Sequence, residues 1–300
     1  MVYNNLSGYF RQKYGKRIGK ICIDGGFTCP NRDGKCGTGG CIFCGERGAG
    51  EHIDAGKSIR DQVKNELSTA KDDDIFVAYF QNFTNTYAPI KTLKERYDAA
   101  LIDNRIKALA IGTRPDCIDE EICRLINEYK TRLDVWVELG FQTANDETAK
   151  IINRGYGKAC FEKAMQLLDK YNIPVCVHMI IGLPGEDIDD IKNSTEYLSS
   201  FNLWGIKIHS LYVMRGTVLD KMYQSGKYTP MTLDEYVESA VYMLTHISPD
   251  TIVHRLTGDA PRDTLTAPEW NRDKHRIIGE IVKKMESQNL YQGCLYNKTE

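Results

Sequence analysis

Three cysteines offer the most specific chemistry in the sequence. Cys29, Cys41 and Cys44 lie in one glycine-rich segment, residues 25–46, with eleven residues between the first two and two between the last two. A tight fold of the intervening GTGG run would let the three thiolates converge, and converging soft ligands indicate a metal site. Three thiolates that hold a 4Fe-4S cluster leave one iron open to a small molecule. That open iron is the functional hypothesis.

Two other interpretations of these thiols stay open. Together with Cys36, the three cysteines could form a four-thiolate structural zinc site, or all four thiols could be reduced and bind nothing. Zinc sites of this kind usually combine two CxxC pairs, and only Cys41 and Cys44 have that spacing. The other six cysteines are interpreted as small hydrophobic residues: Cys22, Cys117, Cys123, Cys160, Cys176 and Cys294.

Composition limits the class of protein. A chain of 300 residues can bury one large core, and a formal net charge of -2 provides no overall basic field for nucleic acid, so partner recognition has to be local. Ten cysteines and an N-terminus without an apolar leader lead us to expect a cytoplasmic protein. The longest nearly apolar run, residues 175–183, contains a histidine and is too short to span a membrane.

The elements that must position the cysteines alternate between strands and helices. Runs rich in Val and Ile predict six strands, at residues 18–24, 75–79, 108–113, 135–139, 175–181 and 206–211. Helical patterns lie between them, at residues 58–70, 90–103, 119–131, 160–171 and 187–201. This alternation predicts the α/β class, with parallel strands in a partial (β/α)6 TIM-like barrel.

The pattern changes after residue 216. A helical stretch at 231–247, a further short strand at 251–256 and a basic helix at 271–288 follow. We therefore expect two parts, a barrel core with an N-terminal basic segment at residues 1–216 and an α-rich extension packed on it at residues 217–300.

The cysteine segment directly follows the first predicted strand. In parallel α/β barrels the carboxyl ends of the strands assemble the site, so the residues after the other strands should complete it. Each later strand ends in polar groups or glycine, within the motifs YFQNFTNTYAP, IGTRPD, ELGFQT, HMIIGLPGE and KIHSLYVMRGT.

These motifs resemble a known family. The segment that ends in CIFC, with an aromatic residue before the last cysteine, resembles the radical S-adenosylmethionine (SAM) superfamily. The runs GFTCPNRDG, YFQNFTNTYAP, IGTRPD, VELGFQT, NRGYG, HMIIGLPGE and HRLTGDAP resemble the YtqA/YhcC family, which is related to the Elongator catalytic subunit. The resemblance spans roughly residues 5–290. The usual spacing CxxxCxxC is replaced by a long first gap, as in the Elongator-like subgroup, and Cys36 is not an expected ligand.

The resemblance implies a 4Fe-4S cluster held by Cys29, Cys41 and Cys44, and SAM bound at the open iron. One electron would cleave SAM to a 5'-deoxyadenosyl radical, in a chamber closed to solvent. Because such clusters have low potentials, a flavodoxin or similar reductase is implied as the electron donor. The implied SAM-binding residues are Gln81, Asn82, Glu138, Gln142, Arg154 and Gly182.

Structural alternatives accompany these assignments. Arg154 could cap the preceding helix, Gln142 could hold a loop together, and Gly182 could serve a plain turn. The close relatives read Glu-Thr-Arg-Pro-Asp where this chain has Gly112 before Thr113 and Arg114, which removes one expected contact.

The substrate follows from the resemblance alone. The YtqA branch is associated with wobble-uridine modification, in which 5-carboxymethylaminomethyluridine becomes 5-aminomethyluridine in tRNA. The implied catalytic residues are Arg114 or Arg255 for a substrate carboxylate, and His178 or His209 as proton carriers. A lone histidine in a strand is more often a core residue than a catalyst.

The partner is expected to be tRNA. Two groups of basic residues are candidates for phosphate contacts, or are ordinary solvated surfaces: Arg11, Lys13, Lys16, Arg17 and Lys20, and Arg272, Lys274, Arg276, Lys283 and Lys284. The alternatives are a radical SAM enzyme that acts on a small metabolite and a metal-binding protein without enzymatic activity.

Overall fold

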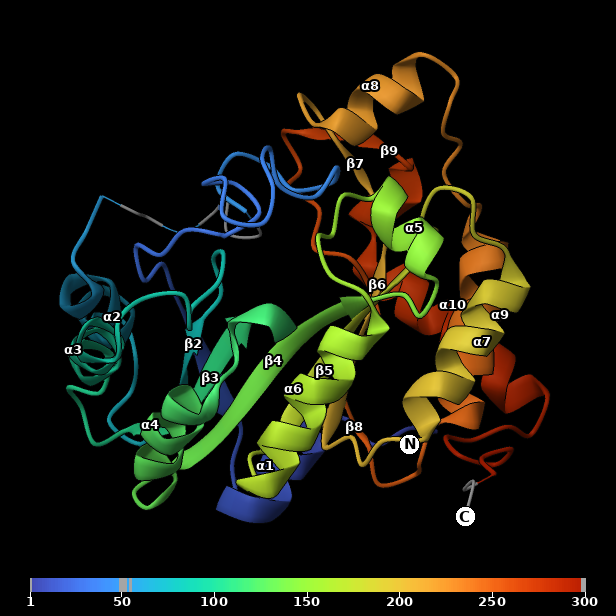
Figure 1. Ribbon diagram of the computed structural model, residues 1–300. Coiled ribbons are helices and arrows are strands. Elements are labelled where there is room, and N and C mark those ends of the chain that lie inside the picture. The colour runs from blue at the N-terminus through green and yellow to red at the C-terminus, as the bar shows by residue number, and fades with distance from the viewer. Residues whose placement is uncertain (1, 49–52, 54–55, 298–300) are drawn as a thin grey trace.

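The central sheet of the computed structural model is parallel and strongly curled (Figure 1). The structure describes residues 2–48, 53 and 56–297. Within them, seven strands pair in the order β1-β2-β3-β4-β5-β6-β8. Their bounds are β1 (Ile18–Ile23), β2 (Ile75–Phe80), β3 (Ile106–Thr113), β4 (Asp134–Gln142), β5 (Val175–Ile181), β6 (Gly205–Ser210) and β8 (Ile252–Arg255). The predicted α/β class and incomplete TIM-like barrel are confirmed.

The seventh strand corrects the predicted number of six. Residues 251–256, expected in the C-terminal extension, supply β8, which pairs in parallel with β6 through Ile206 and Val253. The same sheet therefore crosses the expected boundary between residues 216 and 217, and that boundary stays a prediction.

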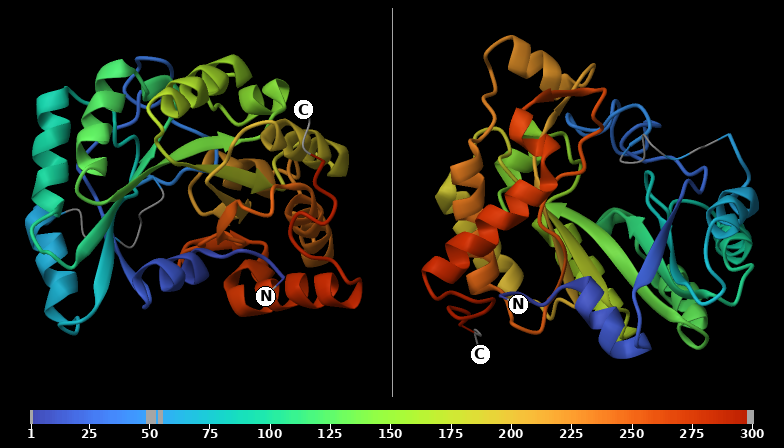
Figure 2. Two further views of the ribbon diagram at one scale, coloured as in Figure 1. Left: turned by 90° about the horizontal axis from the view of Figure 1, so that it is seen from below. Right: turned by 180° about the vertical axis from the view of Figure 1, so that it is seen from behind.

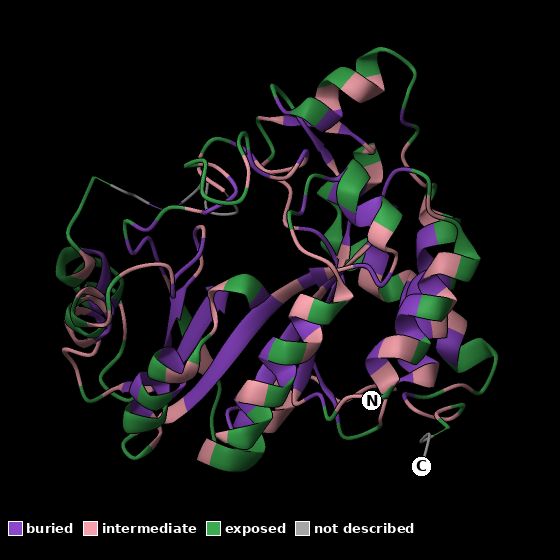
Figure 3. Ribbon diagram, in the orientation of Figure 1, coloured by how far each residue is buried: buried purple, intermediate pink, exposed green. Residues whose placement is uncertain are grey.

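Helices cover the outer face of the sheet (Figure 3). They are α2 (Ile59–Ser68), α3 (Ile90–Ala100), α4 (Glu120–Lys130), α6 (Lys158–Lys170), α7 (Ile188–Ser199), α9 (Leu233–His246) and α10 (Lys274–Ser287). Side chains of Ser58, Asp119, Asp187 and Thr232 accept hydrogen bonds from the first turns of four of them. Such caps satisfy backbone N–H groups that have no partner within the helix, which is why these helices begin where the sequence predicts.

A further helix, α1 (Leu6–Tyr14), lies on the inner side of the sheet. Its Phe10 is fully buried, in one cluster with inward-facing residues that include Val77, Trp136 and Cys176. Lys13 and Tyr14 both bond to Asp134, the first residue of β4. Helix α1 therefore packs where the strands begin, and Figure 1 and the right view of Figure 2 place the cysteine segment at the opposite end.

Small elements surround that second end. They are α5 (Asp146–Ile151), α8 (Val218–Gln224) and a two-stranded antiparallel ribbon of β7 (Val213–Met214) and β9 (Leu265–Ala267). The sequence patterns did not predict them, because each is too short for a clear period. Among the described residues, none of the helices has the length and apolar character needed to cross a membrane.

Candidate active site

A cavity of about 260 Å³ lies at the carboxyl ends of the strands. Its upper wall is the segment with Cys29, Cys41 and Cys44, and its floor consists of polar side chains on the inner face of the sheet. The strand residues at the floor are Tyr79, Glu138, His178, Lys207, His209 and Arg255. The cysteines and the polar floor thus face the same space.

The three predicted ligands are close to one another. Cys41 and Cys44 share a hydrogen bond. This bond and burial raise the pKa of the Cys41 thiol, whereas the same bond lowers the pKa of Cys44 to about 7. The thiolate is the form that binds metals. Cys36 does not line the cavity: its thiol is exposed, accepts a bond from Arg114 Nη2 at 3.5 Å and lies 3.7 Å from Asp116 Oδ2. Three soft donors on one cavity fit an iron–sulfur cluster.

Contacts from distant segments hold the cysteine segment in place. Ile42 N–H donates to Ile152 O at 3.1 Å, and Leu219 N–H donates to Ile42 O at 2.9 Å. Asn153 Nδ2 donates to Gly40 O at 2.7 Å. A Cβ at Gly37 would lie 2.1 Å from Asn31 Oδ1, so a larger residue there would require the Asn31 side chain to move. The loop is therefore fixed by the turn after α5 and by α8.

Three of the predicted SAM-binding residues line the cavity: Gln81, Glu138 and Gln142. Gln142 has a φ of 66°, a left-handed conformation that costs free energy in a residue other than glycine. This turn directs its amide into the cavity, where Oε1 accepts a bond from Tyr156 Oη at 3.2 Å.

Asn82 and Gly182 lie away from the cavity lining. Asn82 is fully buried, and its Nδ2 donates to Asp24 Oδ2 at 2.7 Å. Gly182 has a φ of 94°, and its carbonyl accepts a bond from Tyr228. Both residues stabilise loops at the strand ends, and SAM contacts from them stay a prediction that the cavity lining does not support.

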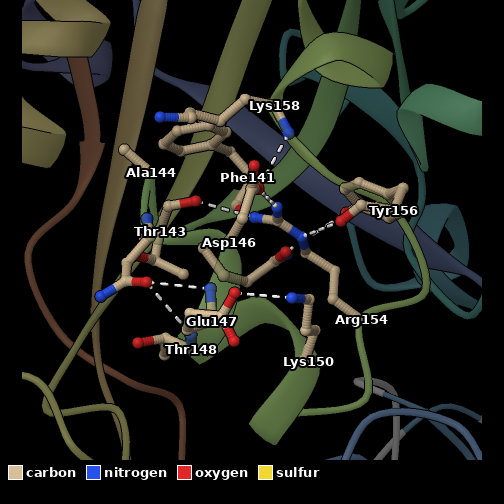
Figure 4. A network of polar contacts seen from close by, with 12 residues as sticks. Phe141, Thr143, Ala144, Asp146, Glu147, Thr148, Lys150, Arg154, Tyr156 and Lys158 are labelled. Atoms are coloured by element: carbon tan, nitrogen blue, oxygen red, sulfur yellow. Dashed lines mark hydrogen bonds and ion pairs between the residues drawn. The ribbon is translucent and has the colours of Figure 1, made fainter.

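Arg154 also differs from the expectation (Figure 4). Its side chain is 1% exposed, and its guanidinium donates to the carbonyl oxygens of Phe141, Thr143 and Tyr156 and lies 3.5 Å from Asp146 Oδ1. A bidentate bond to a SAM carboxylate would require it to leave these carbonyls. The structure therefore places Arg154 as a support of the loop after β4, and its side chain bonds to carbonyls outside helix α5.

Glu138, predicted to bind SAM, instead occupies the floor. The carboxylate is 1% exposed and bonds to the ammonium of Lys207, to His178 Nε2 at 2.8 Å and to Trp136 Nε1 at 3.2 Å. Burial alone would raise its pKa, but Lys207 and His178 hold the pKa of Glu138 well below its usual range. Glu138 is therefore a buried, ionised partner of neighbouring side chains.

Lys207 and Tyr79 are functional candidates that the sequence interpretation missed. Lys207 Nζ donates to Tyr79 Oη at 3.1 Å, and burial lowers the pKa of Lys207 to about 8 against the opposing effect of Glu138. The sequence did contain a signal for Lys207. Side chains alternate along a strand, so a lysine between Ile206 and Ile208 must face inward if the two isoleucines pack under the helices.

The four predicted catalytic residues all line the cavity. The rings of His178 and His209 lie 5.2 Å apart, and burial lowers the pKa of both. Arg255 pairs with Asp259 at 3.3 Å and is partly exposed. Arg114 is held by Asp116 through two bonds, of 2.9 and 2.8 Å, so it is the less available cation for a substrate.

A second group of possible metal ligands lies beneath the floor of the cavity. Ligand atoms of Glu138, Cys176 and His254 are within 4.8 Å of one another, and both ring nitrogens of His254 lack hydrogen-bond partners among the described residues. A metal cation there would meet the ammonium of Lys207, which already binds Glu138. Since like charges repel strongly in a buried site, this cluster does not suit a cation.

The two basic groups lie in different places. Lys13 pairs with Asp134 at 2.5 Å and Lys16 with Asp73 at 3.7 Å, at the edge where the strands begin. Lys274 contacts Asp259, which lines the cavity. Lys13 and Lys16 are therefore at the end of the barrel opposite the cysteines, whereas Lys20 Nζ lies 5.0 Å from the ring centroid of Tyr79 in the cavity floor and Lys274 is beside the cavity.

Sequence comparisons give matches over most of the chain. The Radical SAM superfamily profile matches residues 32–198, and the Radical SAM C-terminal domain profile matches residues 203–287. YtqA of Bacillus subtilis is 37% identical over 304 residues, which is 99% of this chain and 94% of YtqA. YhcC of Escherichia coli is 36% identical over 295 residues, which is 98% of this chain and 96% of YhcC.

More distant proteins share part of the chain. A tRNA uridine(34) acetyltransferase of Methanocaldococcus jannaschii is 31% identical over 198 residues, 64% of this chain and 35% of that protein. Among solved structures, the archaeal Elp3 of Methanocaldococcus infernus superposes with a TM-score of 0.64 at 22% identity, over 78% of this chain and 59% of that chain. The similarity to this Elp3 structure shows a shared fold.

Proposed function

The chain belongs to the radical SAM superfamily and is an enzyme of that superfamily, similar over nearly its whole length to YtqA and YhcC, and we propose that it acts on a wobble uridine of tRNA. Enzymes of this superfamily use a 4Fe-4S cluster and SAM. The observation that carries the proposal is that three thiols and a polar, partly cationic floor face one cavity.

Each part of the cavity has a proposed role. Cys29, Cys41 and Cys44 hold the cluster, and Gln81 and Gln142 bind SAM. When bound, the cluster and SAM supply a 5'-deoxyadenosyl radical that abstracts a hydrogen atom. The side chains of the chain itself exclude water, bind the substrate and accept a proton.

The proposed reaction converts 5-carboxymethylaminomethyluridine to 5-aminomethyluridine. The hydrogen atom comes from the glycine-like methylene, where the neighbouring nitrogen stabilises the carbon radical. The substrate carboxylate needs a cation, and Arg255 is better placed than Arg114 because Arg114 is fully engaged by Asp116. The RNA substrate is supported by the tRNA uridine(34) acetyltransferase to which the chain is similar over 198 residues.

The partners follow from this reaction. A flavodoxin or similar reductase would supply the electron that SAM cleavage needs, and the expected compartment is the cytoplasm. A small metabolite remains the alternative substrate, since the cavity would admit the substituent of a base or a free acid of similar size.

The experiment is turnover with defined RNA. Reconstituted, reduced protein is incubated with SAM and with tRNA that carries 5-carboxymethylaminomethyluridine, and nucleosides are quantified by mass spectrometry. We expect 5'-deoxyadenosine and 5-aminomethyluridine together, and neither in a Cys41→Ala control. Cleavage of SAM with the tRNA left unchanged would favour the small-metabolite alternative.

A further inference from the structure

The floor of the cavity contains one histidine whose orientation is fixed by a buried carboxylate. His178 Nε2 lies 2.8 Å from Glu138 Oε2, and the low pKa of Glu138 keeps that oxygen an acceptor. His178 therefore carries its proton on Nε2. Its side chain is 23% exposed and lines the cavity, and no hydrogen bond to Nδ1 is present within the described part of the chain. The free lone pair on Nδ1 is thus available to a substrate.

We propose that His178 is the proton acceptor of this cavity, and that Glu138 and Lys207 are positioning residues that fix its tautomer and its charge. The inference rests on the proposed function only for the identity of the substrate. The histidine itself would be the catalytic residue, whereas the other two act through it.

Lys207 decides the charge of the pair. A carboxylate beside an imidazole would normally favour the imidazolium, which has no free lone pair. Here the ammonium of Lys207 already neutralises Glu138, and it lowers the pKa of His178 in addition to the effect of burial. The resting imidazole is therefore neutral, and Glu138 can stabilise the imidazolium that forms when a proton arrives.

His209 is less suited to the role. Its Nε2 is buried without a hydrogen-bond partner among the described residues. Its charged neighbours are mainly cations, Arg255 and Lys207, and burial and His178 also lower its pKa. A proton on His209 would lack the carboxylate that His178 has.

Charged and titratable groups surround His178 on every neighbouring strand. They are Lys20 and Cys22 on β1, Tyr79 on β2, Glu138 on β4, Cys176 on β5, Lys207 and His209 on β6, and His254 and Arg255 on β8. Among them Glu138 is the one acid that bonds directly to the His178 ring. The balance between this acid and the nearby cations sets the charge of His178.

The proton balance of the proposed reaction needs such a group. The radical supplied by bound SAM would take a hydrogen atom from the methylene carbon, and the N–H bond of the adjacent amine would break with its proton moving to His178 Nδ1. The remaining electron passes to a one-electron acceptor of the iron–sulfur class. A C=N bond forms, and water splits it into the aminomethyl nucleoside and an aldehyde acid, glyoxylate. Atoms, protons and electrons then balance.

The first test uses the protein without substrate. Six histidines are present, and ¹⁵N-labelling of imidazoles with a His178→Gln variant assigns the resonance of His178. We expect the Nε2–H tautomer at neutral pH. Lys207→Met should raise the pKa of His178 by about 1–3 units, and Lys207→Arg should restore the wild-type value. Lys192→Met, at an exposed ion pair, is the matched control and should change nothing.

A double variant serves as a control for the single variant, because it leaves no buried charge without its partner. Glu138→Gln with Lys207→Met removes both charges, while the amide oxygen introduced at position 138 would still accept from Nε2–H of His178. The tautomer should therefore persist and the pKa increase should disappear. An Nδ1–H tautomer in the wild type, or a His178 pKa unaffected by Lys207→Met, would overturn the positioning roles.

The second test concerns turnover. His178→Gln should still release 5'-deoxyadenosine but lose product formation by about 10²-fold or more, with glyoxylate lost in parallel, whereas the control Lys192→Met should retain both products. Normal product formation by His178→Gln would overturn its role as proton acceptor. If the wild-type enzyme leaves this tRNA unchanged, the proposed function fails, and the imidazole titrations still decide the positioning roles.

Discussion

At the scale of residues, the four thiols of the cysteine segment separate into two kinds. We expect Cys29→Ala, Cys41→Ala and Cys44→Ala to lose most of the iron after anaerobic reconstitution, because each thiol lines the cavity. Cys36→Ala should keep full iron and absorbance, since its thiol is exposed, contacts Arg114 and Asp116 and is not part of the cavity lining. Iron analysis and visible absorbance check this. Loss of iron in Cys36→Ala alone would refute the assignment.

Arg154 is expected to matter for stability. Arg154→Ala removes a buried guanidinium that bonds to three backbone carbonyls. Phe141 O still accepts from Thr143 N–H, but each buried acceptor left without a partner costs roughly 1–3 kcal/mol, so the free energy of unfolding should fall by about 2 kcal/mol or more. Urea denaturation measures this, with the exposed Arg124→Ala as the control. Unchanged stability with weakened SAM binding would instead support direct contact with SAM.

Glu186 should make stability depend on pH. Burial raises the pKa of Glu186 to about 7, and its side chain bonds to Thr143. The pKa of this carboxyl group is about 7 in the folded state and 4.5 in the unfolded state. The free energy of unfolding therefore falls as pH rises from about 4.5 through 7, because the unfolded state loses its proton first. Glu186→Gln should therefore stabilise the protein at pH 8 by at most ~3 kcal/mol and have little effect at pH 4. Denaturation at both pH values checks this, and an equal effect at both would contradict it.

At the scale of elements, β8 ties the C-terminal part to the barrel. A protein that ends at residue 216 would lack β8 and α9, exposing the edge of β6 and the buried surface of α7. We expect this fragment to lose cooperative thermal unfolding, whereas a chain that ends at residue 297 should unfold as the full chain does. Circular dichroism measures both. A stable, cooperatively folded fragment would establish residues 1–216 as an independent domain.

At the scale of the whole molecule, the position of the basic residues directs the RNA prediction. Arg215 and Arg262 flank the β7–β9 ribbon next to the cavity-lining Met214 and Asp259. Both arginines are exposed. Neutralising both should weaken tRNA binding and reduce the slope of log affinity against log salt by about 1–2. The matched control, Lys13→Ala with Lys16→Ala at the opposite end, should change neither quantity. Filter binding at several salt concentrations distinguishes them.

The sequence by itself determined the architecture and the metal-binding chemistry of this protein. Alternating strands and helices follow local periods of apolar residues, so the parallel sheet and the helices over it could be predicted, and β5 begins and ends where its Val and Ile run does. Soft thiolates with short spacing and glycines that permit close approach also leave a local signal, from which Cys29, Cys41 and Cys44 are predicted as the ligands.

Only the tertiary structure decided which polar residues meet. Glu138, His178 and Lys207 are separated by up to 69 residues, and their contact depends on the register of β4, β5 and β6. Arg154 resembled a ligand-binding residue in sequence, yet the loop after β4 turns its guanidinium onto buried carbonyls. The physical reason is that buried polar groups must find partners, and those partners are chosen by the packing of distant strands.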